Sequence, residues 1–169
     1  MYENKPNRLR EYDYSTSGYY FITACTKKRI HYFGEIINAR MVLNKCGEII
    51  YKQWIWLGKQ YDYIALDSFV IMPDHIHGII YIDSSVGMGR DPYLRRKTKS
   101  LSELIGAFKT TSSKKIHNQG FHQFQWQQSF YDHIIRNEES LNVIREYIIE
   151  NPLRWQFKQC HSHPPIPFP

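Results

Sequence analysis

The stretch of residues 64–82 reads IALDSFVIMPDHIHGIIYI. It predicts one strand over residues 64–72 and another over residues 75–82, because both segments are rich in β-forming side chains. Only Pro73 and Asp74 separate the two segments, and so short a connection joins antiparallel neighbours. These residues are therefore expected to form a β-hairpin.

Two further elements are expected before this hairpin. Residues 19–26, with the sequence YYFITACT, predict another strand by their aromatic and β-branched content. Asn44 is a suitable N-cap for a helix over about residues 45–59, which contain apolar side chains at helical spacing. The order up to the hairpin is therefore strand, helix, strand, strand.

The elements after the hairpin complete the pattern. Ser100 and Glu103 have the spacing of a capping box, which predicts a helix that begins there and runs to about His117. Residues 129–136 predict a fourth strand. A last helix is expected to begin at Asn137, which two glutamates follow at the positive end of the helix dipole, and to end at Pro152.

This order, β-α-β-β-α-β with one more helix, predicts an α+β fold. It is the order of a ferredoxin-like antiparallel sheet with helices on one face and an added C-terminal helix. This last helix carries Tyr147, which is discussed below as a candidate nucleophile. We expect a single domain over residues 1–158, followed by a His- and Pro-rich tail over residues 159–169.

Length and composition limit the class of protein. The chain has 169 residues, of which 42% are hydrophobic, and this suits one packed domain. No apolar run approaches the roughly 18 residues that a membrane span needs. The three cysteines are scattered, as expected of reduced thiols inside a cell. We expect a cytoplasmic protein with no membrane partner.

The net charge of +6 is concentrated in one window of the sequence, residues 90–115. Eight basic residues stand there against two acidic ones, a surplus that equals the whole net charge. A localised basic surplus is typical of proteins that bind nucleic-acid phosphates, and a solvated loop and helix face has the same composition. The candidate DNA-binding residues are Arg90, Arg95, Arg96, Lys97, Lys99, Lys109, Lys114 and Lys115. If they contact phosphates, neutralising three of them should flatten the salt dependence of binding.

Two histidines at alternate positions are the first candidates for chemistry. In a strand, His75 and His77 point to one face while Ile76 points to the other. Two such imidazoles can chelate one divalent cation, although the same spacing also occurs in purely structural pairs. His161 and His163 share this spacing, but no rigid element orients them, so we interpret them as incidental.

The last helix offers partners for the histidine pair. Tyr147 and Asn151 are four residues apart on the flank of the buried stripe, where side chains reach an adjoining sheet. They supply a phenol and an amide oxygen, which suits Mg²⁺ or Mn²⁺. Most of the 13 tyrosines must serve packing, however, and Asn151 precedes Pro152 and can simply end the helix. Tyr131 is a rival nucleophile, which we interpret as a packing residue of its strand.

Six motifs also lie in a fixed order along the chain. They are residues 19–23 (YYFIT), 41–44 (MVLN), 69–80 (FVIMPDHIHGII), 126–127 (WQ), 131–136 (YDHIIR) and 147–152 (YIIENP). Together they resemble the IS200-like tyrosine transposases, in particular the REP-associated branch. The resemblance extends from about Arg8 to Trp155.

This resemblance implies a nuclease of the His-hydrophobic-His (HUH) type that acts on single-stranded or hairpin DNA. Carried over, His75, His77 and Asn151 would hold a divalent cation, Mg²⁺ or Mn²⁺, and Tyr147 would be the nucleophile. Its attack on phosphorus would give a 5′-phosphotyrosine and a free 3′-OH, from which strands can be rejoined without ATP. Relatives act as domain-swapped dimers or with the tyrosine in cis, so both monomer and homodimer stay open.

One position departs from the family pattern. Asp74 stands where Asn or Glu is expected, and it either assists the metal or shapes the turn after Pro73.

Three other classes of protein fit less well. A catalytically silent, sequence-specific DNA-binding protein is the main alternative. It should have at least one of His75, His77 and Tyr147 missing or wrongly oriented, and all three are present. A histidine-triad phosphate hydrolase needs a third histidine at the position of Ile79. An RNA-binding ferredoxin-like domain needs an aromatic pattern on a central strand that this chain lacks.

Overall fold

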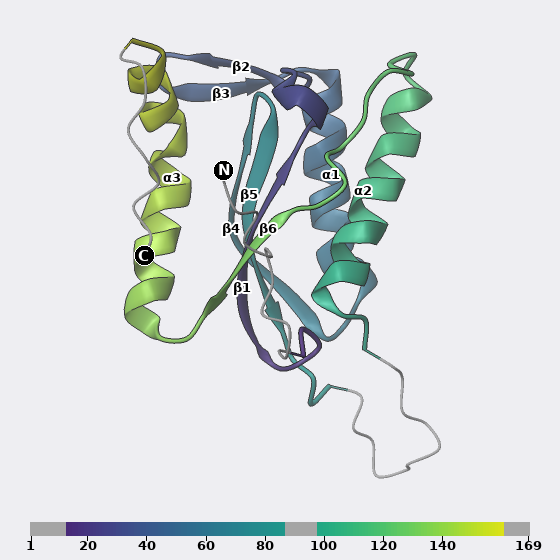
Figure 1. The fold of residues 1–169 in the computed structure, drawn as a ribbon, viewed down its shortest axis with the longest axis vertical. Helices are drawn as coiled ribbons and strands as arrows, with labels where there is room; N and C mark the ends of the chain where they lie inside the picture. Colours follow the sequence, from purple (N-terminus) through teal and green to yellow (C-terminus); the bar gives the residue numbers. More distant parts are fainter. Residues whose placement is uncertain (1–12, 87–97, 161–169) are drawn as a thin grey trace, which may run out of the picture.

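A four-stranded antiparallel sheet forms the centre of the molecule (Figure 1). The computed structural model describes residues 13–86 and 98–160. The strands are β1 (Gly18–Cys25), β4 (Ile64–Met72), β5 (His75–Ile82) and β6 (Tyr131–Ile135), in the spatial order β4-β5-β1-β6. All neighbouring pairs are antiparallel, so the predicted ferredoxin-like α+β fold is confirmed.

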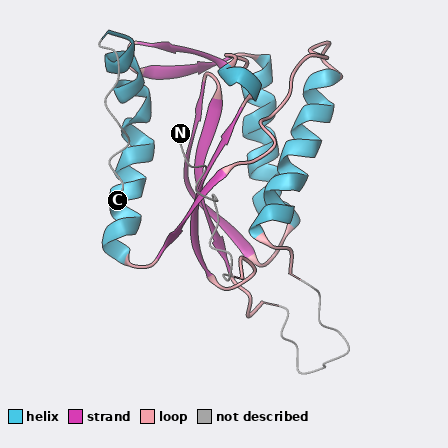
Figure 2. Cartoon of the chain, in the orientation of Figure 1, coloured by secondary structure: helices cyan, strands magenta, loops and turns pink. Residues whose placement is uncertain are grey.

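Helices cover both faces of this sheet (Figure 2). The helices α1 (Lys45–Gln60) and α2 (Leu101–His117) lie on one face, and α3 (Glu138–Cys160) lies on the other. Alternate residues of β1 divide between the faces. Tyr20 and Ile22 pack into the larger core with α1 and α2, while Phe21 packs into a smaller cluster with α3.

All three predicted helix starts are confirmed, and at the third the Asn137 side chain accepts a hydrogen bond of 2.8 Å from the backbone N–H of Ser140. The side chain of Asn44 accepts a hydrogen bond of 3.0 Å from the backbone N–H of Gly47. The backbone N–H of Ser100 donates to the Glu103 carboxylate at 2.8 Å, and the Glu103 N–H donates back to the Ser100 hydroxyl at 3.4 Å. Such caps satisfy the backbone donors that a helix start leaves without intrahelical partners, so these local signals determine where α1 and α2 begin.

A small hairpin that sequence analysis did not predict lies between β1 and α1. Its strand β2 (Gly34–Ile37) pairs antiparallel with β3 (Arg40–Leu43). The two turn residues, Asn38 and Ala39, have positive φ angles of 49° and 58°, as a type I′ turn requires. Alanine is a poor residue for that conformation, so the turn lacks the Asn-Gly signal by which such hairpins are usually found.

The prediction that Pro152 ends the last helix is wrong. α3 continues through Pro152, which is buried, although proline removes one backbone N–H from the helix. Tertiary contacts of the second half offset that loss. The Gln156 side chain accepts a hydrogen bond of 2.5 Å from the Ala39 N–H, and the Trp155 ring lies 5.7 Å from the ring of His31. The extended helix therefore docks on a hairpin that the sequence did not reveal.

The end of α3 also changes the predicted start of the tail. Gln159 and Cys160 belong to the helix rather than to the tail expected from residue 159. Residues 161–169, with His161 and His163, lie outside the described part of the chain, as do Arg90, Arg95, Arg96 and Lys97 of the basic window. Among the described residues, no helix is both long and apolar enough to cross a membrane.

Candidate active site

His75 and His77 bring their imidazoles together beneath α3. Strand alternation places both on the α3 face of β5, while Ile76 between them lies in the core on the other face. The exposed fractions of His75 and His77 are only 3% and 6%. Their Nε2 atoms are 3.0 Å apart. The two ring nitrogens that could bind a common cation therefore converge in a buried position.

The other ring nitrogen of each histidine is held by a polar neighbour. The Nδ1 atom of His77 lies 2.7 Å from the hydroxyl oxygen of Thr23, its cross-strand partner on β1. The Nδ1 atom of His75 lies 2.5 Å from a carboxylate oxygen of Asp74. Such outer partners fix the orientation and tautomer of a histidine ligand.

Asp74 joins His75 to a basic turn after β1. Its second carboxylate oxygen is 2.8 Å from Nε of Arg29, and its backbone carbonyl accepts a hydrogen bond of 2.8 Å from the N–H of Thr26. Arg29 also donates to the sulfur of Cys25. Burial raises the pKa of the Cys25 thiol, although the positive charge of Arg29 opposes that shift. Asp74 thus both supports a candidate ligand and stabilises the turn.

The hydrogen bonds of His75 and His77 determine whether their Nε2 atoms have lone pairs for a cation. The Asp74 carboxylate can only accept, so His75 carries its proton on Nδ1 and directs a lone pair from Nε2 toward His77. The Thr23 hydroxyl can either accept from or donate to His77. If it accepts, two Nε2 lone pairs face one another, and a shared cation would satisfy both. If it donates, His77 donates directly to His75.

The candidate donor set combines nitrogen and oxygen ligands. Among the residues that the structure describes, no three His, Cys, Asp or Glu side chains are grouped so as to hold a metal ion. The predicted set has a different composition, since it combines two imidazoles with the amide of Asn151. The amide oxygen favours Mg²⁺ or Mn²⁺, and the two Nε2 atoms, 3.0 Å apart in a buried position, would complete the set if both present lone pairs.

Tyr147 lies against this histidine pair. Its ring centroid is 5.3 Å from that of His77, with the rings edge to face. Phe21 lies between sheet and helix, stacked on His77 at 5.4 Å and edge-on to Tyr147 at 6.1 Å. The guanidinium of Arg154 lies over the Tyr147 ring, 5.8 Å from its centroid, and is paired with Glu150. The helix thus brings a phenol and a cation next to the imidazoles.

Asn151 lies between two residues of α3 that contact the histidines. Tyr147, one turn earlier, contacts His77, and Trp155, one turn later, lies 5.7 Å from the ring of His75. Residues spaced by four share one face of a helix, so Asn151 faces the sheet at the level of the histidine pair. Its exposed fraction of 6% agrees with this position.

Tyr131, the rival nucleophile, lies on the same face of the sheet at the edge strand β6. It pairs with Thr23, and its ring meets Phe21 edge-on at 6.4 Å. The ring is 45% exposed, more than its interpretation as a packing residue implies. Burial, followed by the charge of Asp132, raises the pKa of Tyr131, and this disfavours its phenolate form.

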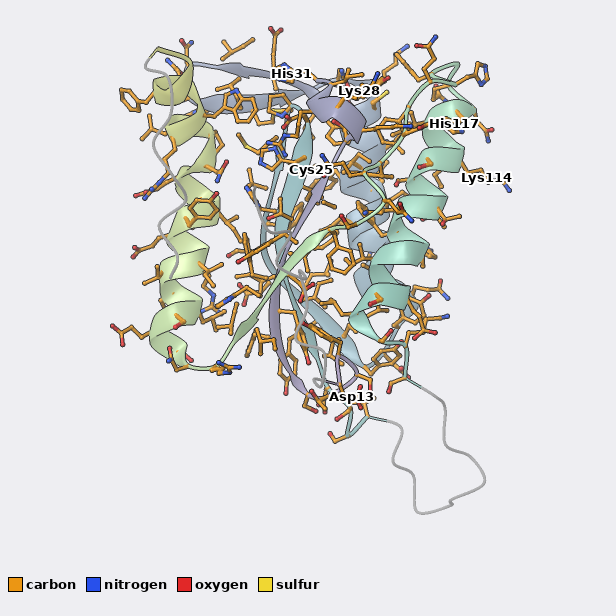
Figure 3. The ribbon with its side chains drawn as sticks, viewed as in Figure 1. Asp13, Cys25, Lys28, His31, Lys114 and His117 are labelled. Carbon is orange, nitrogen blue, oxygen red and sulfur yellow. The ribbon has the colours of Figure 1, made fainter. Side chains whose placement is uncertain are left out.

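The described part of the basic window lies mainly on the opposite face of the sheet. Lys109, Lys114 and Lys115 belong to α2, and Figure 3 shows Lys114 and His117 on that helix, on the far side of the sheet from α3. The Lys109 ammonium donates to the carbonyls of Gln127 (2.9 Å) and Ser129 (2.8 Å) at the surface. Lys114 and Lys115 are therefore separated from the histidine pair, and Lys109 already binds the loop before β6.

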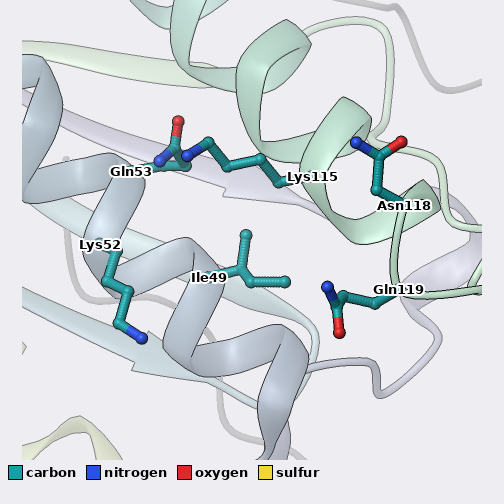
Figure 4. Close-up of a pocket in the computed structure, with 6 residues that line it drawn as sticks. All are labelled: Ile49, Lys52, Gln53, Lys115, Asn118 and Gln119. Atoms are coloured by element: carbon teal, nitrogen blue, oxygen red, sulfur yellow. The ribbon is translucent and has the colours of Figure 1, made fainter.

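A shallow pocket of about 270 Å³ lies between α1 and the end of α2 (Figure 4). It is lined by Ile49, Lys52, Gln53, Lys115, Asn118 and Gln119. None of these residues belongs to the group around His75 and His77. This pocket and the candidate chemistry thus lie on different faces of the sheet.

Three groups around the histidine pair were not predicted from the sequence. They are the basic turn with Arg29, the ring of Trp155 and the guanidinium of Arg154. A signal was present for the last two, because they continue the α3 face of Tyr147 by two turns, but the expected helix end at Pro152 concealed it. The turn with Arg29 was indicated only by three consecutive basic residues directly after the predicted strand of residues 19–26.

Comparison with known proteins identifies first the fold and then the family. No family model matches the chain. A solved structure of a REP-associated tyrosine transposase bound to a REP hairpin aligns with a TM-score of 0.60 and 19% sequence identity, over 88% of this chain and 73% of that chain. A protein of Deinococcus radiodurans R1 aligns over 86% of this chain and 96% of that chain, with 17% identity and a TM-score of 0.48. The fold is thus that of the REP-associated tyrosine transposase, in agreement with the resemblance found in the sequence.

A relative of higher sequence identity comes from Haemophilus influenzae strain Rd. This uncharacterised protein is 37% identical over 172 residues, which cover 95% of this chain and 94% of the relative. The chain belongs to the family of that protein.

Proposed function

We propose that this protein is a DNA transposase that nicks and rejoins single-stranded DNA beside a hairpin, with Tyr147 as its nucleophile. The main support is the 5.3 Å ring contact between Tyr147 and His77, whose Nε2 atom lies 3.0 Å from that of His75. A nucleophile for phosphoryl transfer must lie beside the groups that bind the phosphate. The transposase that shares this fold is bound to a REP hairpin, which supports hairpin DNA as the ligand.

The proposed reaction exchanges one phosphate ester for another. When bound by His75, His77 and Asn151, a Mg²⁺ or Mn²⁺ ion would polarise the scissile phosphate and stabilise charge on the leaving oxygen. The phenolic oxygen of Tyr147 attacks phosphorus, so that its bond to phosphorus forms as the bond to the 3′ oxygen breaks. Overall, the phenol loses a proton and the 3′ oxygen gains one. The 5′-phosphotyrosine then reacts with a 3′-OH, and the same exchange in reverse joins the strands without ATP.

The residues around Tyr147 hold it in place for this attack. Phe21 contacts the rings of both Tyr147 and His77, and so keeps nucleophile and imidazole at a fixed separation. Arg154, which is paired with Glu150, places its guanidinium over the phenol. Because in-line attack needs the reacting atoms near contact distance, such positioning accelerates the reaction.

A covalent adduct is the direct test of this function. Wild-type protein with labelled single-stranded hairpin DNA and Mn²⁺ should form a protein–DNA adduct that survives denaturing electrophoresis. Tyr147→Phe removes one oxygen, so the variant should fold and bind DNA but form no adduct, whereas Tyr131→Phe should retain it. An adduct in the Tyr147→Phe protein, or a labelled peptide that contains Tyr131, would show that the nucleophile is assigned wrongly.

A DNA-binding protein without cleavage is the second candidate. One observation favours it: the 3.0 Å separation also allows His77 to donate a hydrogen bond directly to His75, which satisfies both imidazoles without a cation. In that case the wild-type protein binds hairpin DNA and forms no adduct with either Mg²⁺ or Mn²⁺.

A further inference from the structure

We propose that a surface next to the histidine pair binds the single strand that leads to the scissile phosphate. This surface consists of Lys27 and Lys28 with the rings of His31 and Trp155, and we call it the stacking surface. The proposal rests on the proposed function, because it assigns a place to the strand that Tyr147 would cut.

The stacking surface adjoins the histidine pair through the chain itself. β1 ends at Cys25, the cross-strand partner of His75, and the short helix η1 (Lys27–Arg29) follows almost at once. Arg29 returns to Asp74 at 2.8 Å and so fixes this turn to the site. Figure 3 shows Lys28 and His31 at the same end of the molecule, with Cys25 directly below them.

The aromatic rings of the surface extend from the exposed His31 to the buried His75. The ring of Trp155 lies 5.7 Å from His31, which is exposed, and 5.7 Å from His75, which is buried. Trp155 itself is partly exposed. Proteins that bind single-stranded DNA stack successive bases on such rings, because every base has a π-face and the contact tolerates any sequence.

The basic part of the surface supplies charge for the phosphates. Both Lys27 and Lys28 are exposed. Lys27 donates to the side chain of Gln125 at 2.7 Å, while Lys28 makes no hydrogen bond or ion pair with any residue that the structure describes. The charge of Arg29 is opposed by Asp74, so it belongs to the site rather than to the surface. Two cations beside an aromatic pair are the combination that tracks a single-stranded backbone.

The backbone of the turn is strained in a way that allows a clean test. Lys28 and Arg29 have φ angles of 58° and 57°, a left-handed conformation that glycine adopts more readily than lysine or arginine. Strained residues of this kind gather at functional sites. Replacing Lys28 with glycine removes its charge and relieves the strain, so this variant should keep the conformation of the turn.

The experiment measures binding of a labelled oligothymidylate of about 15 nucleotides by fluorescence anisotropy. The parent is the Tyr147→Phe protein without divalent cations, so that no strand is cut. Lys28→Gly should weaken binding about threefold and reduce the salt slope by about 0.7, since one phosphate contact is lost. Trp155→Leu should weaken binding about tenfold, since base stacking is lost.

Two matched variants serve as controls. Lys59→Ala removes an equal charge from the last turn of α1, and should bind the oligothymidylate as the parent does. Lys28→Arg keeps the charge and should also bind normally. Unchanged affinity in both Lys28→Gly and Trp155→Leu, or an equal loss in Lys59→Ala, would overturn the stacking surface.

Failure of the two proposals can be told apart. Adduct formation by the wild type together with unchanged affinities in the variants would leave the proposed function intact and exclude the stacking surface. Absence of any adduct together with weakened binding in Lys28→Gly and Trp155→Leu would exclude the proposed chemistry and leave the surface as a site for single-stranded DNA.

Discussion

Under α1 and α2, the sheet packs a continuous apolar core in which Trp54, Phe108 and Ile76 have no exposed surface. Under α3, the buried residues include two histidines and an asparagine beside a much smaller apolar cluster. Burying polar groups lowers stability unless they find partners, and here Thr23 and Asp74 supply them. The comparison teaches that one face of the sheet provides stability while the other accommodates chemistry.

The first half of α3 attaches the helix to the sheet, while its second half lies over the candidate site. Its apolar contacts come from Leu141, Ile144 and Ile148, all in the first half of the helix. The ion pair of Arg145 with Asp67 on β4, at 2.9 and 2.6 Å, adds a polar clamp in the same half. Tyr147 and Trp155 are thereby left to present aromatic side chains to the histidine pair.

The largest expected effect separates two adjacent residues of β5. His77→Ala should abolish metal-dependent cleavage of hairpin DNA, because it removes one of two converging ligands, while DNA affinity stays close to that of the wild type. Ile76→Val, on the other face, should lower the free energy of unfolding by about 1 kcal/mol and leave cleavage intact. Gel-based cleavage assays and urea titrations measure the two effects. Equal loss of cleavage in both variants would contradict the division between faces.

The second effect concerns the close approach of sheet and helix on the core face. A Cβ atom at Gly78 would lie 2.4 Å from a ring carbon of Trp54, which is fully buried. Gly78→Ala should therefore lower the free energy of unfolding by about 3 kcal/mol, measured by denaturant titration. Gly106→Ala on α2 is the control, because its Cβ would meet nothing within 4 Å, and it should be neutral or slightly stabilising.

A third effect tests the polar support of the site. Asp74→Asn removes the charge that faces both Arg29 and His75, so titration calorimetry should show Mn²⁺ affinity about 10- to 100-fold weaker than in the wild type. Thermal unfolding serves as the control for the fold. Unchanged Mn²⁺ affinity would mean that Asp74 only shapes the turn.

The smallest effect concerns the clamp of α3. The hydrogen bonds from Arg145 hold the pKa of Asp67 below its usual value. A carboxyl whose pKa is lower in the folded state stabilises the protein above its unfolded pKa of about 3.9, and this contribution disappears as the pH falls through the folded value. Arg145→Gln should cost about 1 kcal/mol at pH 7, and the difference from wild type should shrink below about pH 4. A difference that is constant down to about pH 2 would rule out this ion pair as its cause.

Local sequence signals determined most of the fold because their physics is local. The caps at Asn44 and Ser100 act on the next backbone turn, and the hairpin around Pro73 follows from two adjacent β-rich segments. The alternation of His75 and His77 is likewise a property of any strand. Each of these features is confirmed because it depends only on residues close to it in the chain.

The continuation of α3 past Pro152 could not be read in this way. Proline disfavours a helix interior locally. Docking of the second half of α3 reverses that preference, through Gln156 on the β2–β3 hairpin and through Trp155 on His31. The hairpin itself was concealed by an alanine in its turn. The proline in α3 and the alanine in the turn each argued against the observed structure, and the contact between Gln156 and Ala39 joins the two elements nevertheless.

The placement of charge shows the same limit. The sequence by itself determined the antiparallel sheet, the start of each helix and a histidine pair on one strand face. Only the tertiary structure decided that α2, with Lys109, Lys114 and Lys115, lies on the face away from that pair, and that the basic turn of η1 lies beside it. Neighbouring positions in a sequence constrain one another through backbone geometry, whereas the side on which a helix covers a sheet depends on how the whole chain buries its apolar surface.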